Sequence, residues 1–261
     1  MDGPIFIFGC GWRTGSTLLQ RLLCSHNEIH IWGEHAGILL QLRQIQEQVE
    51  QIDALSSRHR NDYEKNGANS WIAMMNPNCS HFQEGVKSLL EQYYKKPASE
   101  LNASRWGFKE VRYDFTMAEY ILKLFPNARI IFLIRHPKAC LASARATKTM
   151  FLKKGLLSDV GGPVEFLQHW TRLASSFSHP NNSSRFLLLK YEEMTASPES
   201  AIKDIAAFLE TDADAFDASV FGTRKRGWLG RDPRLENEDL AALLSDDLWT
   251  MARNYGYEPE N

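Results

Sequence analysis

The sequence predicts an α/β fold in which helices cover both faces of a mostly parallel central sheet. Short runs rich in β-branched and aromatic residues alternate with longer helical patterns along the 261 residues, as in chains built from strand–helix–strand units. Several of these short runs are continuously apolar, which is typical of parallel strands that are buried on both faces.

Four runs are expected to form the strands, with helices between and around them. The strand runs are residues 5–9, 106–111, 129–134 and 185–189. Helices are expected to begin near Ser16, Glu34, Phe82, Asp114, Lys138, Val164, Pro198 and Glu238.

One of the helices should be long and amphipathic. Between residues 38 and 55, six apolar residues recur at intervals of three or four, which is the spacing of one helix face. The pattern ends before a third heptad is complete, and its outer face carries glutamines rather than paired charges. We therefore expect this face to pack against the domain's own core, with a coiled coil as the alternative.

Composition restricts the class of protein. Hydrophobic residues make up 43% of the chain and charged residues 24%, which are ordinary globular values and argue against a disordered chain. The net charge of −2 gives no general attraction to nucleic acid or to anionic lipid. Since no linker or composition shift divides the chain, we expect one domain over residues 1–261.

The N-terminal region and the cysteines predict a cytoplasmic protein. The chain opens on an apolar strand without the charged lead of a signal peptide, and no run approaches the about 20 apolar residues that span a bilayer. The cysteines lack metal-binding spacing and are expected to be reduced thiols. They are Cys10, Cys24, Cys79 and Cys140. We therefore expect no structural metal and no membrane contact.

The first candidate anion site lies in the glycine-rich turn that follows the strand at residues 5–9. A strand that feeds such a turn and then a helix presents backbone N–H groups and the positive end of the helix dipole to one anion. Ser16 and Thr17 add hydroxyl groups, and Arg13 adds a charge that can bind two oxygens at once. The alternative is an ordinary turn in which Ser16 only caps the helix. We favour the anion site because glycines, hydroxyls and arginine converge within nine residues.

The position of the cation in this turn argues against nucleoside triphosphates. A triphosphate-binding loop places lysine directly after the last glycine, where it reaches the terminal phosphates. Here Ser16 follows Gly15, and the cation is Arg13, two positions before that glycine.

A second candidate anion site follows the strand at residues 129–134. Arg135 comes at the carboxyl end of that strand, where α/β sheets place ligand-binding groups. Ser143 comes eight positions later, about two helical turns on, and can share a phosphate with Arg135. An enzyme that uses magnesium and a triphosphate would more often place an aspartate at such a strand end.

The two segments together resemble the signature motifs of sulfotransferases that use 3'-phosphoadenosine 5'-phosphosulfate (PAPS). The resemblance implies the P-loop-like sulfotransferase fold, PAPS as donor, 3',5'-ADP as product and no metal. It assigns the 3'-phosphate to Arg135 with Ser143 and the 5'-phosphosulfate to the first motif. That motif consists of Arg13, Thr14, Gly15, Ser16 and Thr17.

Two further segments extend the resemblance to about residue 231. Residues 189–194 are similar to the family's strand that ends in a Tyr-Glu pair, which places Tyr191 near the nucleotide. Residues 224–230 are similar to the late basic loop that closes over the 3'-phosphate and adenine. The loop residues concerned are Arg224, Lys225, Arg226 and Gly227.

The region between these motifs differs from the family pattern. Residues of about 36–100 resemble no family motif and are expected to form a helical insertion that shapes the acceptor site. The arginine of the first motif and the later pair Gly33-Glu34 place the chain closer to the tyrosylprotein and bacterial branches than to the cytosolic phenol branch.

Sulfuryl transfer requires in-line positioning, neutralisation of developing charge and a base for the acceptor hydroxyl. In the tyrosylprotein branch a glutamate at corresponding spacing is the base, and this spacing leads to Glu34, 21 residues after Arg13. Helix capping by Glu34 is the alternative. His35 is the rival base, because phenol-branch enzymes use histidine and one alignment gap brings it into place.

Lys109 is the last candidate catalytic residue, beside Arg13. It lies near the end of the strand at residues 106–111, and the tyrosylprotein branch has a lysine at a comparable position. The resemblance assigns it the leaving phosphate or the bridging oxygen, and a structural ion pair is the alternative. Arg112 and Asp114 are candidates for the acceptor site.

The sequence therefore predicts a sulfotransferase that acts on the hydroxyl of a small-molecule acceptor, without nucleic acid or membrane as partner. The alternatives are a P-loop-like small-molecule kinase and a catalytically inactive nucleotide-binding protein. Nucleic-acid binding through residues 224–231 is a weaker alternative, since the chain has no overall positive charge. Acceptor identity and oligomeric state stay open.

Overall fold

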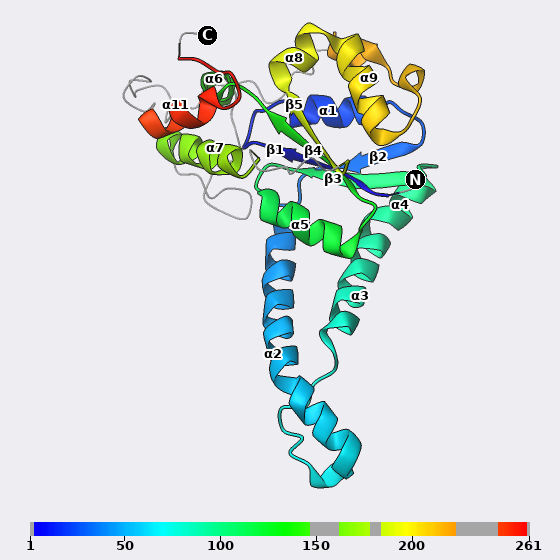
Figure 1. The fold of residues 1–261 in the computed structure, drawn as a ribbon. Coiled ribbons are helices and arrows are strands. Elements are labelled where there is room, and N and C mark those ends of the chain that lie inside the picture. The colour runs from blue at the N-terminus through cyan, green and yellow to red at the C-terminus, as the bar shows by residue number, and fades with distance from the viewer. Residues whose placement is uncertain (1–2, 147–161, 178–183, 223–244, 260–261) are drawn as a thin grey trace.

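The fold is a five-stranded sheet with the strand order β2-β3-β1-β4-β5, in which all neighbouring strands run parallel. The computed structural model describes residues 3–146, 162–177, 184–222 and 245–259, and Figure 1 shows their arrangement. The strands are β1 (Ile5–Gly9), β2 (Ile29–Trp32), β3 (Arg105–Glu110), β4 (Arg129–Ile134) and β5 (Phe186–Lys190). The predicted α/β fold with a parallel sheet is confirmed.

Four of the five strands match the prediction to within one residue, and β2 was missed. β1 and β4 have the predicted bounds, while β3 begins and ends one residue earlier and β5 one residue later than expected. β2 has only four residues, of which His30 and Trp32 are partly exposed. Such a short edge strand lacks the continuous apolar run that identifies the buried strands.

The helices surround the sheet and also form a long projection from it (Figure 1). Five of the predicted starts agree with the structure to within one residue, namely those near Ser16, Asp114, Lys138, Val164 and Pro198. The starts expected near Glu34 and Phe82 fall at Ile38 and Cys79, and the start near Glu238 lies outside the described residues. The helices are α1 (Ser16–Leu23), α2 (Ile38–Asn66), α3 (Cys79–Leu90), α4 (Lys96–Glu100), α5 (Phe115–Leu124), α6 (Pro137–Arg145), α7 (Pro163–Phe177), α8 (Tyr191–Ala196), α9 (Pro198–Leu209) and α11 (Asp246–Arg253). A π-helical turn, η2 (Glu91–Lys95), joins α3 to α4, and short 3-10 turns are η1 (Gly67–Asn69), η4 (Ala213–Ala215) and η5 (Ala218–Phe221).

The alternation of side chains along β1 divides the core into two layers. Ile5 and Ile7 pack in one cluster with residues of α1 and α9. Phe6 and Phe8 pack in the other cluster with residues of α5 and α7. Successive strand residues point to opposite faces, so a fully apolar strand is needed to hold helices on both sides.

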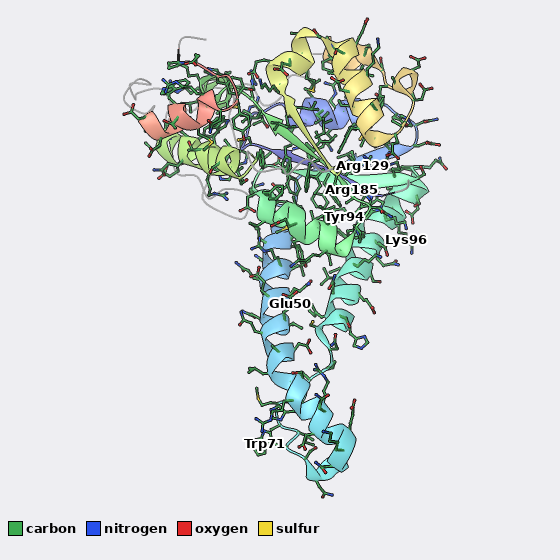
Figure 2. All side chains as sticks on the ribbon, viewed as in Figure 1. Glu50, Trp71, Tyr94, Lys96, Arg129 and Arg185 are labelled. Atoms are coloured by element: carbon green, nitrogen blue, oxygen red, sulfur yellow. The ribbon has the colours of Figure 1, made fainter. Side chains whose placement is uncertain are left out.

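The helices α2 and α3 project away from the sheet as an arm (Figure 1). Figure 2 shows Glu50 partway along this arm and Trp71 at its tip. Of the predicted α2 stripe, Leu42 alone is among the described side chains that pack against the core, while Ile38 is 51% exposed and the fully buried residue at the start of α2 is Leu39, outside the stripe. The later apolar residues are exposed because α2 extends beyond the sheet. These residues are Ile45 (45% exposed), Ile52 (41%) and Leu55 (62%).

Within the described part of the chain, no helix combines the length and the apolar character needed to cross a bilayer. All four cysteines are free thiols. Cys10 and Cys140 are buried, and burial raises the pKa of each thiol.

The contrast along α2 leads to a stability prediction. Leu39→Ala removes a fully buried side chain and is expected to lower the free energy of unfolding by about 2–5 kcal/mol. Ile45→Ala changes an exposed position and is expected to alter it by about 0.5 kcal/mol or less. Urea unfolding of both variants beside the wild type checks this, and equal losses would contradict the described placement of α2.

Candidate functional site

The first motif forms a tight loop at the carboxyl end of β1. Gly11, Arg13 and Gly15 have φ angles of 79°, 66° and 92°, and the buried Thr14 hydroxyl donates to the carbonyl of Gly11 over 3.2 Å. Within the described part of the chain, no backbone carbonyl accepts the N–H groups of residues 13–17. These successive donors and the start of α1 at Ser16 form a cradle of the kind that binds an anion.

Glycine is required at position 15 for two reasons. Its φ of 92° lies in the left-handed region, which side chains disfavour. A Cβ atom there would also lie 2.2 Å from Cδ2 of Tyr191. Tyr191, at the start of α8, therefore packs directly against the first motif.

The second motif lies against the first. Arg13 Nε donates to Ser143 Oγ over 3.1 Å, and an Arg135 terminal nitrogen donates to the carbonyl of Arg13 over 3.0 Å. The Arg135 guanidinium also covers the ring of Tyr191, 4.2 Å from its centroid. The structure thus brings together Arg13, Arg135, Ser143 and Tyr191, which the sequence places far apart.

Arg13 and Arg135 are close to each other, and no carboxylate of the described residues is paired with either. Among the described residues, neither Arg13 nor Arg135 forms an ion pair, and the buried Nε of Arg135 has no hydrogen-bond partner. Burial and the nearby charge of Arg135 lower the pKa of Arg13. Two neighbouring arginines that no described carboxylate pairs with favour a ligand that carries several negative charges.

Glu34 and Lys109 form an ion pair beside this loop. Lys109 Nζ lies 2.5 Å from Glu34 Oε1, and Arg112 lies 3.4 Å from the other carboxylate oxygen. Lys109 is the residue before the last in β3, where it is in register with Ile7 of β1. Although burial acts to raise the pKa of Glu34, the charges and hydrogen bonds of Lys109 and Arg112 outweigh it, so this pKa lies below its ordinary value. The carboxylate is therefore ionised at neutral pH.

Glu34 does not cap α2. The helix begins at Ile38, later than predicted, and its N-cap residue is Gly37, without a side-chain cap. Glu34 lies in the preceding loop, with its side chain 32% exposed. The capping alternative is therefore wrong.

The fully buried carboxylate of Glu110 holds the loop between β2 and α2. This role was not predicted from the sequence. One of its oxygens accepts the N–H groups of Gly37 (2.9 Å) and His35 (3.3 Å). The other accepts the N–H of Val111 (2.9 Å) and a guanidinium nitrogen of Arg112 (2.5 Å). An acidic residue beside cations at the end of an apolar strand was the available signal.

His35 faces the interior of the protein. Its ring lies 4.4 Å from that of Phe108, and its Nε2 atom lies 3.1 Å from the Tyr113 hydroxyl. That hydroxyl also accepts the N–H of Leu39 over 3.0 Å, so Tyr113 ties the His35 ring to the start of α2. Burial lowers the pKa of His35 despite the opposing charge of Glu110, which favours the neutral ring.

The remaining predictions concern Thr17, Asp114 and the late loop. Thr17 is exposed on the first turn of α1, and Asp114 caps α5 by accepting the N–H of Met117 over 3.2 Å. The late loop falls outside the described residues; it contains Arg224, Lys225, Arg226 and Gly227. In the described part of the chain, no group of three or more His, Cys, Asp or Glu side chains is arranged to hold a metal ion.

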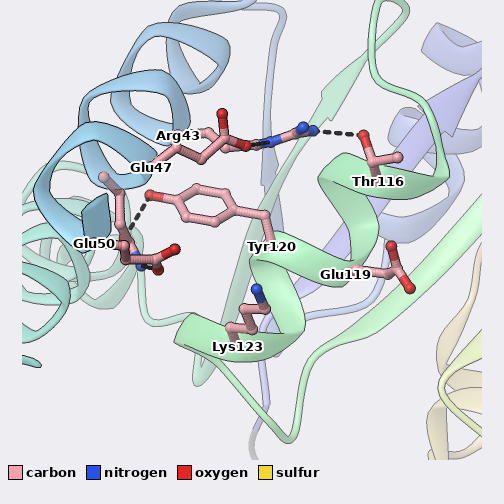
Figure 3. Close-up of a pocket in the computed structure, with 8 residues that line it drawn as sticks. Arg43, Glu47, Glu50, Thr116, Glu119, Tyr120 and Lys123 are labelled. Atoms are coloured by element: carbon pink, nitrogen blue, oxygen red, sulfur yellow. Dashed lines mark hydrogen bonds and ion pairs between the residues drawn. The ribbon is translucent and has the colours of Figure 1, made fainter. Parts of the chain in front are cut away.

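A pocket of about 370 Å³ lies between α2 and α5, away from the two motifs (Figure 3). Its polar groups bond to one another: the Tyr120 hydroxyl donates to Gln46 over 3.1 Å, and Arg43 contacts both Glu47 and Thr116. It contains none of the motif residues. We therefore place the candidate site at the loop after β1.

Known proteins share this sequence pattern and fold. The pattern described as "Sulfotransferase family" matches residues 4–215. The sulfotransferase domain from the Synechococcus PCC 7002 olefin synthase is 19% identical, with a TM-score of 0.54 over 99% of this chain and 97% of that one. The sulfotransferase domain from the curacin biosynthetic pathway is 19% identical, with a TM-score of 0.57 over 99% of each chain. A comparison with curated proteins gave no match.

The lowered pKa of Glu34 predicts a pH-dependent contribution to stability. A carboxylate whose pKa is lower in the folded state stabilises the fold above its unfolded pKa and loses this effect as the pH falls through the folded value. The stability difference between wild type and Glu34→Gln should be constant above about pH 5 and shrink below about pH 4. Urea unfolding at a series of pH values measures it, and a difference that grows on acidification would contradict the ion pair.

Proposed function

Because the chain belongs to the sulfotransferase family, we propose that it transfers the sulfuryl group of PAPS to the hydroxyl of a small-molecule acceptor and releases 3',5'-ADP. One observation carries this proposal: two arginines that form no ion pair with any described residue lie against an N–H cradle, with the Glu34–Lys109 pair beside it. When bound, PAPS supplies an activated sulfuryl group on a phosphate leaving group.

The described residues fit this donor. In the proposed arrangement the N–H groups of residues 13–17 and the hydroxyls of Ser16 and Thr17 bind the 5'-phosphosulfate. Arg135, whose buried Nε has no partner in the described part of the chain, binds the 3'-phosphate together with Ser143. Tyr191 supports Arg135 through its ring.

The late loop and the cellular location complete this proposal. Arg224, Lys225, Arg226 and Gly227 are proposed to close over the 3'-phosphate and adenine, on the strength of the family resemblance. A cytoplasmic location is supported by the four free thiols, because oxidising compartments favour disulfides.

Glu34 is the proposed general base. Its carboxylate is ionised and one third exposed, so it can accept the proton of an acceptor hydroxyl. A carboxylate with a low pKa is a weak base, and the contact with Lys109 is a main cause of the low pKa of Glu34. Movement of the Lys109 ammonium toward charge that develops on the leaving phosphate raises the basicity of Glu34 during the reaction. Arg13 stabilises the same charge from the loop.

His35 is less suited to this role than Glu34. Its Nε2 is already in hydrogen-bond contact with the Tyr113 hydroxyl, and its side chain is 11% exposed. An acceptor hydroxyl would have to displace Tyr113 to reach that nitrogen.

We propose that the start of the insertion at residues 36–100 lines the acceptor site, within one domain over residues 1–261. Ile38 begins α2 four residues after Glu34, and its side chain is 51% exposed. An exposed apolar side chain near the base suits an acceptor with an apolar body. Most of the arm leads away from the motifs (Figure 1), so we assign acceptor contact only to its base.

Nucleotide binding should need no magnesium. At a hundred times its dissociation constant, 3',5'-ADP is expected to raise the melting temperature by about 5–10 °C in the presence of EDTA. Thermal unfolding with 3',5'-ADP or with ATP and magnesium measures this. Protection by ATP and magnesium alone would instead identify a kinase.

Removal of the base should affect catalysis more than binding. Glu34→Gln is expected to lower kcat by about 10²–10⁴-fold while the affinity for 3',5'-ADP stays nearly constant. The measurement is PAPS-dependent sulfation across a library of hydroxylated acceptors, detected by mass. Glu64→Gln, an exposed change on the arm, is the control for charge. Full activity of Glu34→Gln together with loss in His35→Ala would overturn the assignment of the base.

A further inference from the structure

The C-terminal segment returns to the second motif. The family pattern ends at residue 215, yet α11 packs against α7, and the residues after α11 lie near α6 (Figure 1). Three hydrogen bonds join this segment to residues close to Arg135 in the structure. Their partners there are His136, Lys138 and Glu192.

Glu192 links the C-terminal segment to the second motif. The Tyr257 hydroxyl donates to Glu192 Oε2 over 2.8 Å, and the N–H of His136 donates to Glu192 Oε1 over 3.0 Å. The His136 ring in turn lies 3.0 Å from the carbonyl oxygen of Glu258. Tyr257 and His136 are both buried. The three segments therefore form a closed set of hydrogen bonds.

The residues joined in this way are the direct neighbours of the site. His136 follows Arg135, and Glu192 follows Tyr191, whose ring the Arg135 guanidinium covers at 4.2 Å. One carboxylate thus fixes the two backbone segments that carry the cation and its supporting ring. The charges of Arg135 and Glu192 act on the same buried thiol: burial raises the pKa of Cys140, Arg135 opposes this rise, and Glu192 adds to it.

We propose that Tyr257 is a positioning residue for Arg135, which holds the Glu192 carboxylate away from the guanidinium and so keeps Arg135 available to the 3'-phosphate. This inference rests on the proposed role of Arg135. Without the tyrosine hydroxyl, one oxygen of Glu192 loses its donor. Arg135 is a cation that can take its place, because its guanidinium covers the ring of Tyr191, the residue before Glu192. A carboxylate on Arg135 competes with phosphate.

The test compares two ligands that differ only in the 3'-phosphate. Isothermal titration calorimetry of the full chain measures the affinities for 3',5'-ADP and 5'-AMP in wild type and Tyr257→Phe. The affinity for 3',5'-ADP is expected to fall about tenfold, and the affinity for 5'-AMP to stay unchanged. A general loosening of the fold would weaken both.

Tyr255→Phe is the matched control. Its hydroxyl belongs to the same segment but donates to the carbonyl of Ala174 in α7, over 2.5 Å. Both affinities should stay at the wild-type level in this variant. Adding Glu192→Gln to Tyr257→Phe removes the competing charge and should restore the affinity for 3',5'-ADP.

Four outcomes would decide against the inference. Equal weakening of both ligands in Tyr257→Phe, or no change in either, overturns it. Should that variant not fold, Glu192→Gln alone decides: affinity for 3',5'-ADP at or above wild type supports the competition, and a lower affinity overturns it. A wild type that does not prefer 3',5'-ADP over 5'-AMP refutes the proposed role of Arg135, and the inference with it.

Discussion

The arrangement of the candidate site depends on the buried carboxylate of Glu110. Burying a charge is costly unless it is paired and hydrogen-bonded, and here four donors surround it. Two of these donors are backbone N–H groups of the loop that follows β2, which carries Glu34. Because Glu110 is the neighbour of Lys109 on β3, the same strand end that supplies the lysine also fixes the position of its partner.

Sheet topology then brings the other groups to this edge. β1 lies between β3 and β4 in the sheet, so the loop that carries Arg13 emerges between Lys109 and Arg135. All three strands are parallel, and their carboxyl ends therefore meet at one edge, where α/β folds bind ligands. Residues more than a hundred positions apart become neighbours through backbone pairing alone.

The sequence was sufficient where a local pattern determines the structure. β1, β4 and the loop between β1 and α1 were predictable because continuous apolar runs and clustered glycines have local causes. The roles of Glu110 and Tyr257 were not, because each depends on partners from other strands or helices. The exposed part of α2 was mispredicted for a related reason: its periodicity predicts an apolar face but contains no information on where the rest of the domain ends.

Two carboxylates beside the site have a common effect on its electrostatics. Glu110 and Glu192 each lie next in sequence to a proposed site residue, and each accepts backbone N–H groups at the edge of the sheet. A site for a ligand with several negative charges must keep its cations unneutralised, yet the fold needs acidic residues to hold its loops. By occupying these carboxylates with backbone and tyrosine donors, the described structure leaves Arg13 and Arg135 without an acidic partner. The charge of the site is thus set by where its carboxylates are held as much as by the arginines themselves.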